Sequence, residues 1–164
     1  MNGAIAMAQF VSPIGVVLMS ADETHLVSVR IAGTGAAAGV TGHPVLAEAL
    51  SQVRDWFAGQ RQDFDLPLVS LDSAEGQALR DGISAIPYGE TRTYGAVAQE
   101  RGSIARAVRQ ACKTNAYPLI IPCHRVTSAT GPEFYSAGEG ARTKGRLLDF
   151  EQSRLPPEQR TRLL

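Results

Sequence analysis

The residues best suited to chemistry are Cys123 and His124, in the run Pro-Cys-His-Arg-Val at residues 122–126. Residues 119–121 are apolar and are expected to form a short buried strand just before the run. The fixed φ of proline would then hold the cysteine in one position. A neighbouring imidazole and guanidinium can stabilise a thiolate, which is the nucleophilic form of cysteine. An arbitrary cysteine is more often buried and inert, and Cys112, inside a predicted helix, fits that class.

The composition of the chain limits the kinds of protein and cellular location in which this chemistry could take place. The chain has 164 residues with two cysteines, three scattered histidines and 44% hydrophobic residues, enough for one domain or two small ones. Two cysteines form no disulfide framework, and no closed Cys/His zinc site is evident. No apolar stretch approaches the ~20 residues of a membrane span, and residues 1–10 lack the features of a signal peptide. The expected location is cytoplasmic, without membrane attachment.

A net charge of zero conceals an asymmetry between the two halves of the chain. Residues 1–85 carry nine acidic and four basic side chains, whereas residues 86–164 carry seven acidic and twelve basic ones. The first half therefore has a charge of −5 and the second half +5. Such a difference points to a polyanion-facing surface in the second half, although basic surfaces are common and the signal alone is weak.

The first part of the chain predicts a small α/β unit. Two β-branched runs, residues 14–19 and 26–31, are separated by a polar turn and read as a hairpin. Residues 44–58 carry apolar side chains at helical spacing, and residues 64–69 read as an extended piece. The fold class expected is α/β (α+β), with an N-terminal α/β domain at residues 1–72 and a mostly helical C-terminal domain at residues 73–164.

The C-terminal domain predicts a helix-turn-helix. Ser73 can cap a helix reaching residue 85, and Thr93 precedes a short helix over residues 94–100. After a Gly-containing turn, Ser103 is expected to cap a second helix over residues 104–114. Three basic residues share one face of that second helix: Arg106, Arg109 and Lys113. This face could bind phosphates or could simply be solvated, and the residues alone leave both interpretations open.

Several motifs in one order resemble the O6-alkylguanine-DNA alkyltransferase family. Ile-Pro-Tyr-Gly-Glu-Thr-x-x-Tyr-Gly begins at residue 86, Ala-Arg-Ala-Val begins at residue 105, and seven residues separate Asn115 from the cysteine of Pro-Cys-His-Arg-Val. The resemblance is strongest over residues 86–126 and resumes over residues 144–151, while the N-terminal part matches only in size and rough pattern. It implies an RNase H-like N-terminal domain, and single-turnover transfer of an alkyl group from O6-alkylguanine, or also O4-alkylthymine, to cysteine.

The resemblance implies a role for each matching residue. Cys123 matches the alkyl acceptor, His124 the base that takes the thiol proton through a water, and Glu151 the acid that orients the histidine. Tyr94 matches a donor to the leaving base, and Asn115 matches a hinge between the recognition helix and the active-site turn. These five residues form the expected catalytic set.

The resemblance also implies a DNA complex in which the damaged base is flipped out of the duplex. Arg106 matches the side chain that replaces the flipped base, on a helix that enters the minor groove. The expected DNA-binding residues are Tyr94, Arg106, Arg109, Lys113 and Arg125. The expected substrate pocket consists of Val126, Tyr135, Ser136 and Lys144. The partner implied is double-stranded DNA carrying O6-alkylguanine, bound by a monomer.

The chain departs from the family pattern at three places. Residues 75–80 replace the family's Phe-Gln…Val-Trp helix, residues 131–140 form a longer and more acidic pocket loop, and Ala116 follows the hinge asparagine where proline is frequent. These departures leave the range of alkyl groups open.

Other classes of function compete with alkyl transfer. A lesion-binding relative that does not remove the alkyl group would lack the acceptor cysteine, whereas Cys123 is present. A thiol hydrolase would need proton transfer between the adjacent Cys123 and His124, whose side chains point apart on an extended turn. A helix-turn-helix transcription factor would leave the Cys-His pair without a task.

Overall fold

The chain divides into two compact units. The computed structural model describes residues 5–32, 42–129 and 140–160. The first unit comprises Met1–Leu71 together with Ala116–Ile120, and the second comprises Asp72–Asn115 and Ile121–Leu164. A segment of the second half thus belongs to the first unit, which the division into two contiguous domains did not include. The mixed α/β class expected from the sequence is confirmed.

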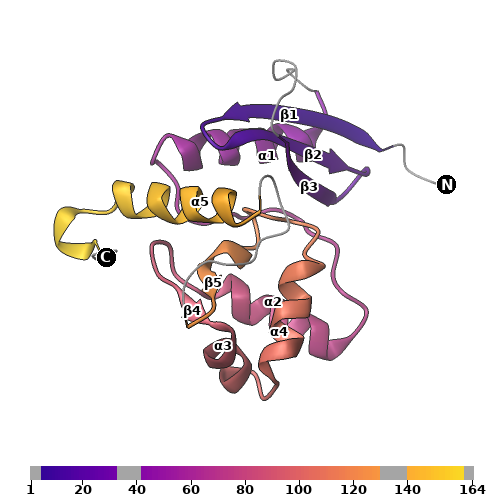
Figure 1. Cartoon of the computed structure of the whole chain (residues 1–164). Helices are drawn as coiled ribbons and strands as arrows, with labels where there is room; N and C mark the ends of the chain where they lie inside the picture. The colour runs from indigo at the N-terminus through magenta and orange to yellow at the C-terminus, as the bar shows by residue number, and fades with distance from the viewer. Residues whose placement is uncertain (1–4, 33–41, 130–139, 161–164) are drawn as a thin grey trace. The chain divides into compact units, whose positions relative to one another are not determined.

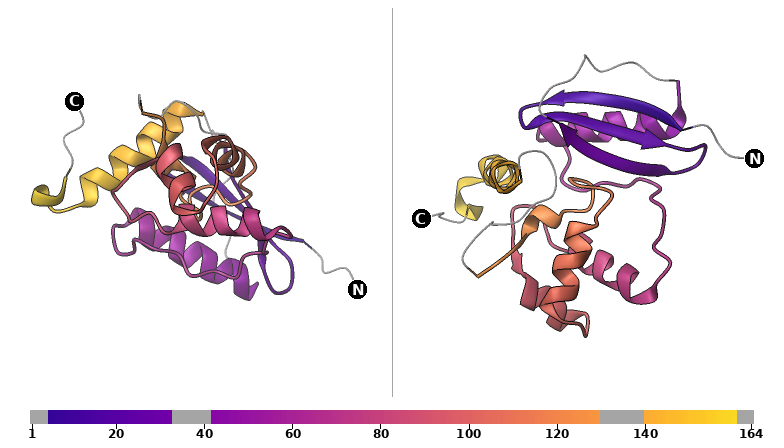
Figure 2. Two further views of the ribbon diagram at one scale, coloured as in Figure 1. Left: turned by 90° about the horizontal axis from the view of Figure 1, so that it is seen from below. Right: turned by 45° about the vertical axis from the view of Figure 1, so that its right-hand side comes forward.

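The first unit is an antiparallel sheet with one helix. Its strands, in spatial order, are β1 (Ala6–Ser12), β2 (Gly15–Ala21) and β3 (Leu26–Ala32), and helix α1 spans Pro44–Phe57. Figures 1 and 2 show α1 lying along one face of the three strands. The predicted hairpin is confirmed as β2 and β3, whereas β1 was not predicted.

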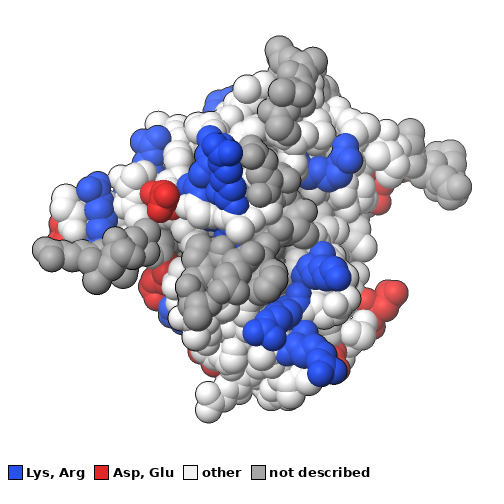
Figure 3. Space-filling view, in the orientation of Figure 1, with Lys and Arg blue, Asp and Glu red and all other residues white. Residues whose placement is uncertain are grey.

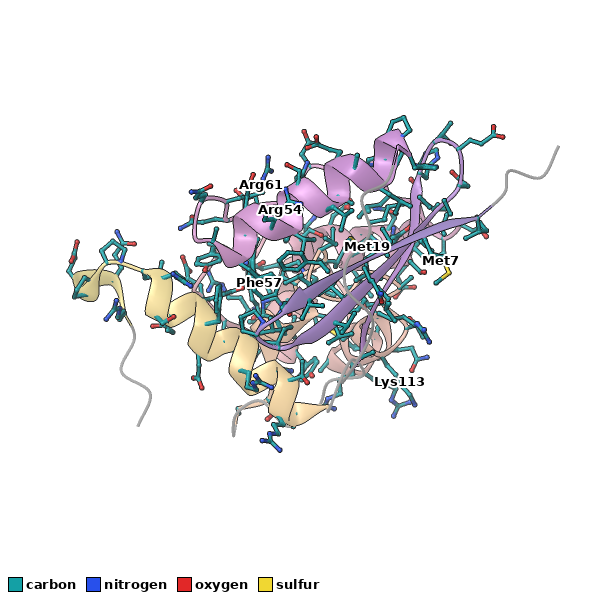
Figure 4. The ribbon with its side chains drawn as sticks, turned by 90° about the horizontal axis from the view of Figure 1, so that it is seen from above. Met7, Met19, Arg54, Phe57, Arg61 and Lys113 are labelled. Carbon is teal, nitrogen blue, oxygen red and sulfur yellow. The ribbon has the colours of Figure 1, made fainter. Side chains whose placement is uncertain are left out.

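Side chains that alternate between the two faces of the sheet explain how α1 packs on it. Val17 and Met19 on β2 are fully buried, and the ring of Phe10 stacks on that of Phe57 with centroids 5.9 Å apart. The opposite side of β1 carries Met7, which is 64% exposed and projects away from the helix (Figure 4). The apolar face of this unit therefore lies between the sheet and α1.

Residues 116–120 attach to the open edge of β3. The amide of Val29 donates to the carbonyl of Ala116 at 2.8 Å. The buried Tyr117 hydroxyl donates to the Leu26 carbonyl at 2.7 Å and accepts from the Val69 amide at 3.0 Å. The strand expected over residues 119–121 is absent, because Leu119 has a φ of 77° and breaks the extended backbone.

The second unit is mainly helical. Its elements are α2 (Ala74–Ser84), β4 (Arg92–Thr93), α3 (Tyr94–Glu100), α4 (Ala105–Lys113), the 3-10 turn η1 (Cys123–Arg125), β5 (Val126–Thr127), α5 (Ala141–Arg154) and η2 (Pro157–Gln159). Strands β4 and β5 pair in parallel. No helix among the described residues is long and apolar enough to cross a membrane.

Local hydrogen bonds set the starts of these helices. Ser73 accepts from the Gly76 amide at 2.8 Å, which confirms the predicted cap. Thr93, predicted to precede a helix, accepts from the Ala96 amide at 3.1 Å. The predicted cap at Ser103 is wrong, since α4 begins after Ile104 without a side-chain cap. The Ser103 hydroxyl instead donates to Glu75 at 3.4 Å, so it joins two segments of the unit rather than closing a helix end.

Candidate functional site

Cys123 opens a tight 3-10 turn directly after Pro122 and is only 2% exposed. Asn115, which follows the end of α4, donates from Nδ2 to Cys123 Sγ at 3.2 Å and to the Ile121 carbonyl at 3.1 Å. One amide group therefore fixes both the sulfur and the backbone that precedes it. This contact agrees with the hinge position expected for Asn115.

The surroundings keep this sulfur protonated at rest. Burial raises the pKa of the Cys123 thiol, and the hydrogen bond from Asn115 and the charge of Lys144 oppose that rise only in part. A buried thiol with a raised pKa is a weak nucleophile until a base removes its proton. The site therefore requires a base close to Cys123.

His124, next to Cys123 in the chain, has the protonation state of a base. Its Nε2 lies 2.6 Å from Glu151 Oε2, and both side chains are fully buried. Burial lowers the pKa of His124 and favours the neutral ring, whose Nε2–H then donates to the carboxylate. Among the described residues Nδ1 has no hydrogen-bond partner, so its lone pair remains able to accept a proton.

Glu151 is held ionised by an arginine next in sequence to the histidine. Arg125 donates to the carboxylate from Nε at 3.0 and 3.1 Å and from Nη2 at 2.9 Å, and the Gly89 amide adds a bond at 2.9 Å. Burial alone would raise the pKa of Glu151, but His124 and Arg125 lower it to about 2. The carboxylate consequently keeps its charge and orients the imidazole.

The geometry does not support the expectation that Arg125 contacts DNA. Its side chain is buried, its Nη1 donates to the Ile86 carbonyl at 2.8 Å, and its guanidinium lies 5.5 Å from the ring centre of Tyr88. A guanidinium already paired with Glu151 inside the unit has a structural task. The pairing was not predicted from the sequence, because the acid lies 26 residues away along the chain.

The turn before β4 is a part of the site that sequence reasoning missed. Gly89, in the Ile-Pro-Tyr-Gly motif, has a φ of 79°, and an added Cβ would lie 2.4 Å from a methyl group of Leu155. Its amide donates to Glu151 and its carbonyl accepts from Gln152 Nε2 at 2.6 Å. The glycine in the motif was the available signal, and the structure shows that it lets this turn approach α5.

Lys144 and Tyr94 form a second buried group in the same unit. Lys144 Nζ donates to the Val126 carbonyl and, at 3.5 Å, to the Tyr94 hydroxyl. Lys144 and Val126 are completely buried, Tyr94 is 3% exposed, and burial lowers the pKa of the lysine. Tyr135 and Ser136, the other two expected pocket residues, lie outside the described part of the chain.

The basic residues of α4 lie at the surface, as their spacing predicted. Arg106, Arg109 and Lys113 are exposed, and Figure 3 shows Lys and Arg side chains gathered over this helix. Lys113 extends into solvent in Figure 4. The guanidinium of Arg109 turns back and lies 5.1 Å from the ring centre of Tyr94. Across residues 5–32, 42–129 and 140–160, no group of three or more potential metal ligands gathers.

These contacts give a buried thiol and, next to it in the chain, a base with a group that orients the base. The chemistry they support is removal of the thiol proton through His124 and attack by sulfur on an electrophilic carbon. Such a site sits beside a helix whose exposed face is basic.

Comparison with known proteins identifies relatives that cover both units. Residues 76–153 match the family model described as 6-O-methylguanine DNA methyltransferase, DNA binding domain. The constitutive methylated-DNA–protein-cysteine methyltransferase of Bacillus subtilis is 40% identical over 111 residues, which span 66% of this chain and 67% of that protein. The methylated-DNA–protein-cysteine methyltransferase of Methanosarcina acetivorans is 34% identical over 153 residues, 89% of this chain and 97% of that protein.

Solved structures agree with the sequence matches. The O6-methylguanine methyltransferase of Mycobacterium tuberculosis superposes with a TM-score of 0.79 at 31% identity, over 94% of this chain and 96% of that one. A structure of the Mycobacterium tuberculosis protein in complex with DNA gives a TM-score of 0.77 at 31% identity, over 92% and 94% of the two chains. The likeness in sequence and fold, together with the Cys-His-Glu arrangement, shows that the chain belongs to the methylated-DNA–protein-cysteine methyltransferase family.

Proposed function

We propose that this protein repairs DNA by moving an alkyl group from O6 of guanine to Sγ of Cys123. The observation that carries the proposal is the buried pair of Glu151 and His124, which directly follows the acceptor cysteine in the chain. His124 follows Cys123 in the chain, is bonded through Nε2 to an ionised Glu151, and has an Nδ1 without a partner among the described residues. This is the arrangement needed to activate a protonated, buried thiol.

The proposed reaction is a single displacement. The Cys123 thiol passes its proton through a water to His124 Nδ1, and the sulfur attacks the alkyl carbon. The bond between that carbon and O6 breaks, and its electron pair goes to the guanine. The guanine then takes up one proton, which His124 returns by way of water, so that alkylguanine and thiol give guanine and a thioether.

Tyr94 is proposed as the donor to the leaving base. Charge develops on guanine as the carbon–oxygen bond breaks, and a preorganised hydroxyl lowers the energy of that charge. Lys144 donates to the Tyr94 oxygen and so holds that oxygen in place.

Each chain is proposed to act once. A thioether is a poor leaving group, and the reaction described above has no step that would return the sulfur to a thiol. The same displacement is chemically equivalent on O4-alkylthymine, which we include in the proposed substrate range.

The proposed DNA complex places the basic face of α4 against the duplex. Arg106, Arg109 and Lys113 would neutralise phosphates, and their neighbours Ala105, Ala107 and Ala111 are small enough for close approach to a minor groove. The reacting carbon of a stacked base is out of reach, so the base must leave the stack before Cys123 can attack it. Arg106 is proposed to fill the space that the base leaves, with one monomer bound per lesion.

The test uses the full-length protein and a duplex oligonucleotide containing one O6-methylguanine. Intact mass spectrometry should show one added methyl group per chain, and peptide mapping should place it on Cys123. Cys123→Ser should remain unmodified, while the matched control Cys112→Ser should be methylated like the unmodified sequence. Binding without an adduct, or an adduct on Cys112, would contradict the proposal.

A further inference from the structure

Two cations contact one aromatic ring in the site. The Arg109 guanidinium carbon lies 5.1 Å from the centre of the Tyr94 ring, and Lys144 Nζ lies 5.6 Å from the same point. A cation over an aromatic face is attracted by the electrons of the ring. The proposed mechanism employs Lys144 and Tyr94 but gives Arg109 only the task of a surface cation.

The two cations differ in how firmly they are held. Lys144 is completely buried and donates to the Val126 carbonyl, so its position is set by the interior of the unit. Arg109 is exposed and belongs to α4, on the same face as Arg106 and Lys113. The side chain of Arg109 therefore runs from the proposed DNA-binding face to a ring that is 97% buried, as Tyr94 is only 3% exposed.

We propose that Arg109 is a positioning residue that links phosphate binding on α4 to the hydroxyl of Tyr94. This inference rests on the proposed function. A guanidinium stacked on a ring keeps its in-plane N–H groups available, so the same side chain can bind a phosphate with its edge. A phosphate bound in this way holds the guanidinium over Tyr94 at the moment of reaction.

The guanidinium acts on the reaction through the electrons of the phenol. When the Tyr94 hydroxyl donates to the leaving guanine, negative charge grows on the phenol oxygen and ring. A cation over the ring stabilises that charge, and its contact also keeps the ring in one orientation. Arg109 therefore contributes to the rate of transfer as well as to the affinity for DNA.

A residue that only contacts phosphate would behave differently. Its loss would weaken DNA binding and reduce the dependence of affinity on salt, without changing the rate once all the protein is bound. A contact of the kind seen here is expected to change the limiting rate by about two- to five-fold at a partly exposed position. The limiting rate at saturating DNA is thus the quantity that separates the two roles.

The experiment measures single-turnover methyl transfer over a range of duplex concentrations, giving an affinity and a limiting rate for each variant. Arg109→Met should weaken binding and lower the limiting rate about two- to five-fold. Arg109→Lys keeps the charge but lacks the planar group, so it should recover most of the affinity and less of the rate. The matched control is Arg154→Met, which removes an Arg–Phe150 contact of 4.8 Å from exposed α5 and should leave the limiting rate unchanged.

A double-mutant cycle shows whether Arg109 acts through the phenol. In a Tyr94→Phe background the hydroxyl is gone, so Arg109→Met should have no further effect on the limiting rate. Three outcomes would overturn the inference while methyl transfer persists. The first is an Arg109→Met variant that keeps the full limiting rate, and the second is a loss of limiting rate on Arg109→Met that is the same in the Tyr94→Phe background as in the unmodified protein. The third is an Arg154→Met variant that loses as much limiting rate as Arg109→Met. If the unmodified protein transfers no methyl group, the proposed function fails, and the inference fails with it.

Discussion

Removing the Arg125 guanidinium should destabilise the protein because it strands a buried charge. Glu151 is completely buried and receives three contacts from Arg125 at 2.9–3.1 Å, and the same side chain satisfies the Ile86 carbonyl. Breaking one partner of such a pair costs about 3–5 kcal/mol. For a chain of this size, Arg125→Met should then lower the melting temperature by roughly 6–20 °C.

Urea unfolding in a double-mutant cycle tests the cause of that loss. Glu151→Gln keeps the shape of the side chain without its charge, so Arg125→Met should cost at least about 1 kcal/mol less in that background. An equal cost in both backgrounds would refute the explanation by a stranded charge. Arg154→Met, an exposed arginine on α5, serves as the control and should cost less than about 1 kcal/mol.

The dependence of stability on acid pH gives a second test of the role of Arg125. The folded-state pKa of Glu151 is lowered from 4.5 to about 2, so its ionisation stabilises the fold above pH 4.5, and this contribution is lost as the pH falls toward 2. Without Arg125 the pKa is lowered less. The difference in stability between the unmodified protein and Arg125→Met should therefore be largest above pH 4.5 and shrink as acid is added; a constant difference over that range would argue against the electrostatic explanation.

Three further outcomes follow from contacts described above. Gly89→Ala should lower the free energy of unfolding by more than about 1 kcal/mol, because φ is positive and the added Cβ would meet Leu155. In the double variant, Leu155→Ala should reduce the loss caused by Gly89→Ala. Additive losses in urea unfolding would contradict the clash. Tyr117→Phe should cost about 1–3 kcal/mol by leaving the Leu26 carbonyl unpaired, and a neutral result in thermal unfolding would refute this. Burial raises the pKa of Cys112 from 9.0 to about 12, so the free energy of unfolding should fall as the pH rises from 9 to 12. Cys112→Ser should make that fall shallower by about 1.4 kcal/mol per pH unit. An unchanged dependence of the unfolding free energy on pH would show that this thiol does not contribute.

Local signals in the sequence were sufficient for much of the second unit. Ser73 and Thr93 have side chains that bond amides three residues later, and Gly102 permits the turn between α3 and α4. Each of these depends on neighbours in the chain, so spacing alone predicted it. The cap at Ser103 failed because α4 begins one residue later than predicted, so that Ile104, which has no capping group, occupies the cap position.

The buried contacts of Arg125 and Glu151 could not be predicted from local sequence, because they join residues far apart in the chain. The Arg125 side chain is buried because it forms an ion pair with an acidic side chain, and that partner, Glu151, lies on a helix 26 residues away. The family resemblance supplied Glu151 as the partner of His124 but gave no indication that Arg125 shares it. Leu119, with a positive φ in an apolar run, likewise contradicts the strand that its composition favours.

The attachment of Ala116–Ile120 to β3 has a consequence for synthesis, because these residues are made after the rest of the first unit. The first 71 residues contain the β1–β3 sheet and α1, and they include Pro67, the partner of the Leu26 amide. The partners of the Val29 amide and the Leu26 carbonyl, Ala116 and Tyr117, come later in the chain. Until then the β3 edge has open hydrogen-bonding groups, as any unpaired strand edge does. The ribosome therefore completes α4 before these last partners of β3 are available, and the Cys123 turn follows them directly in the chain.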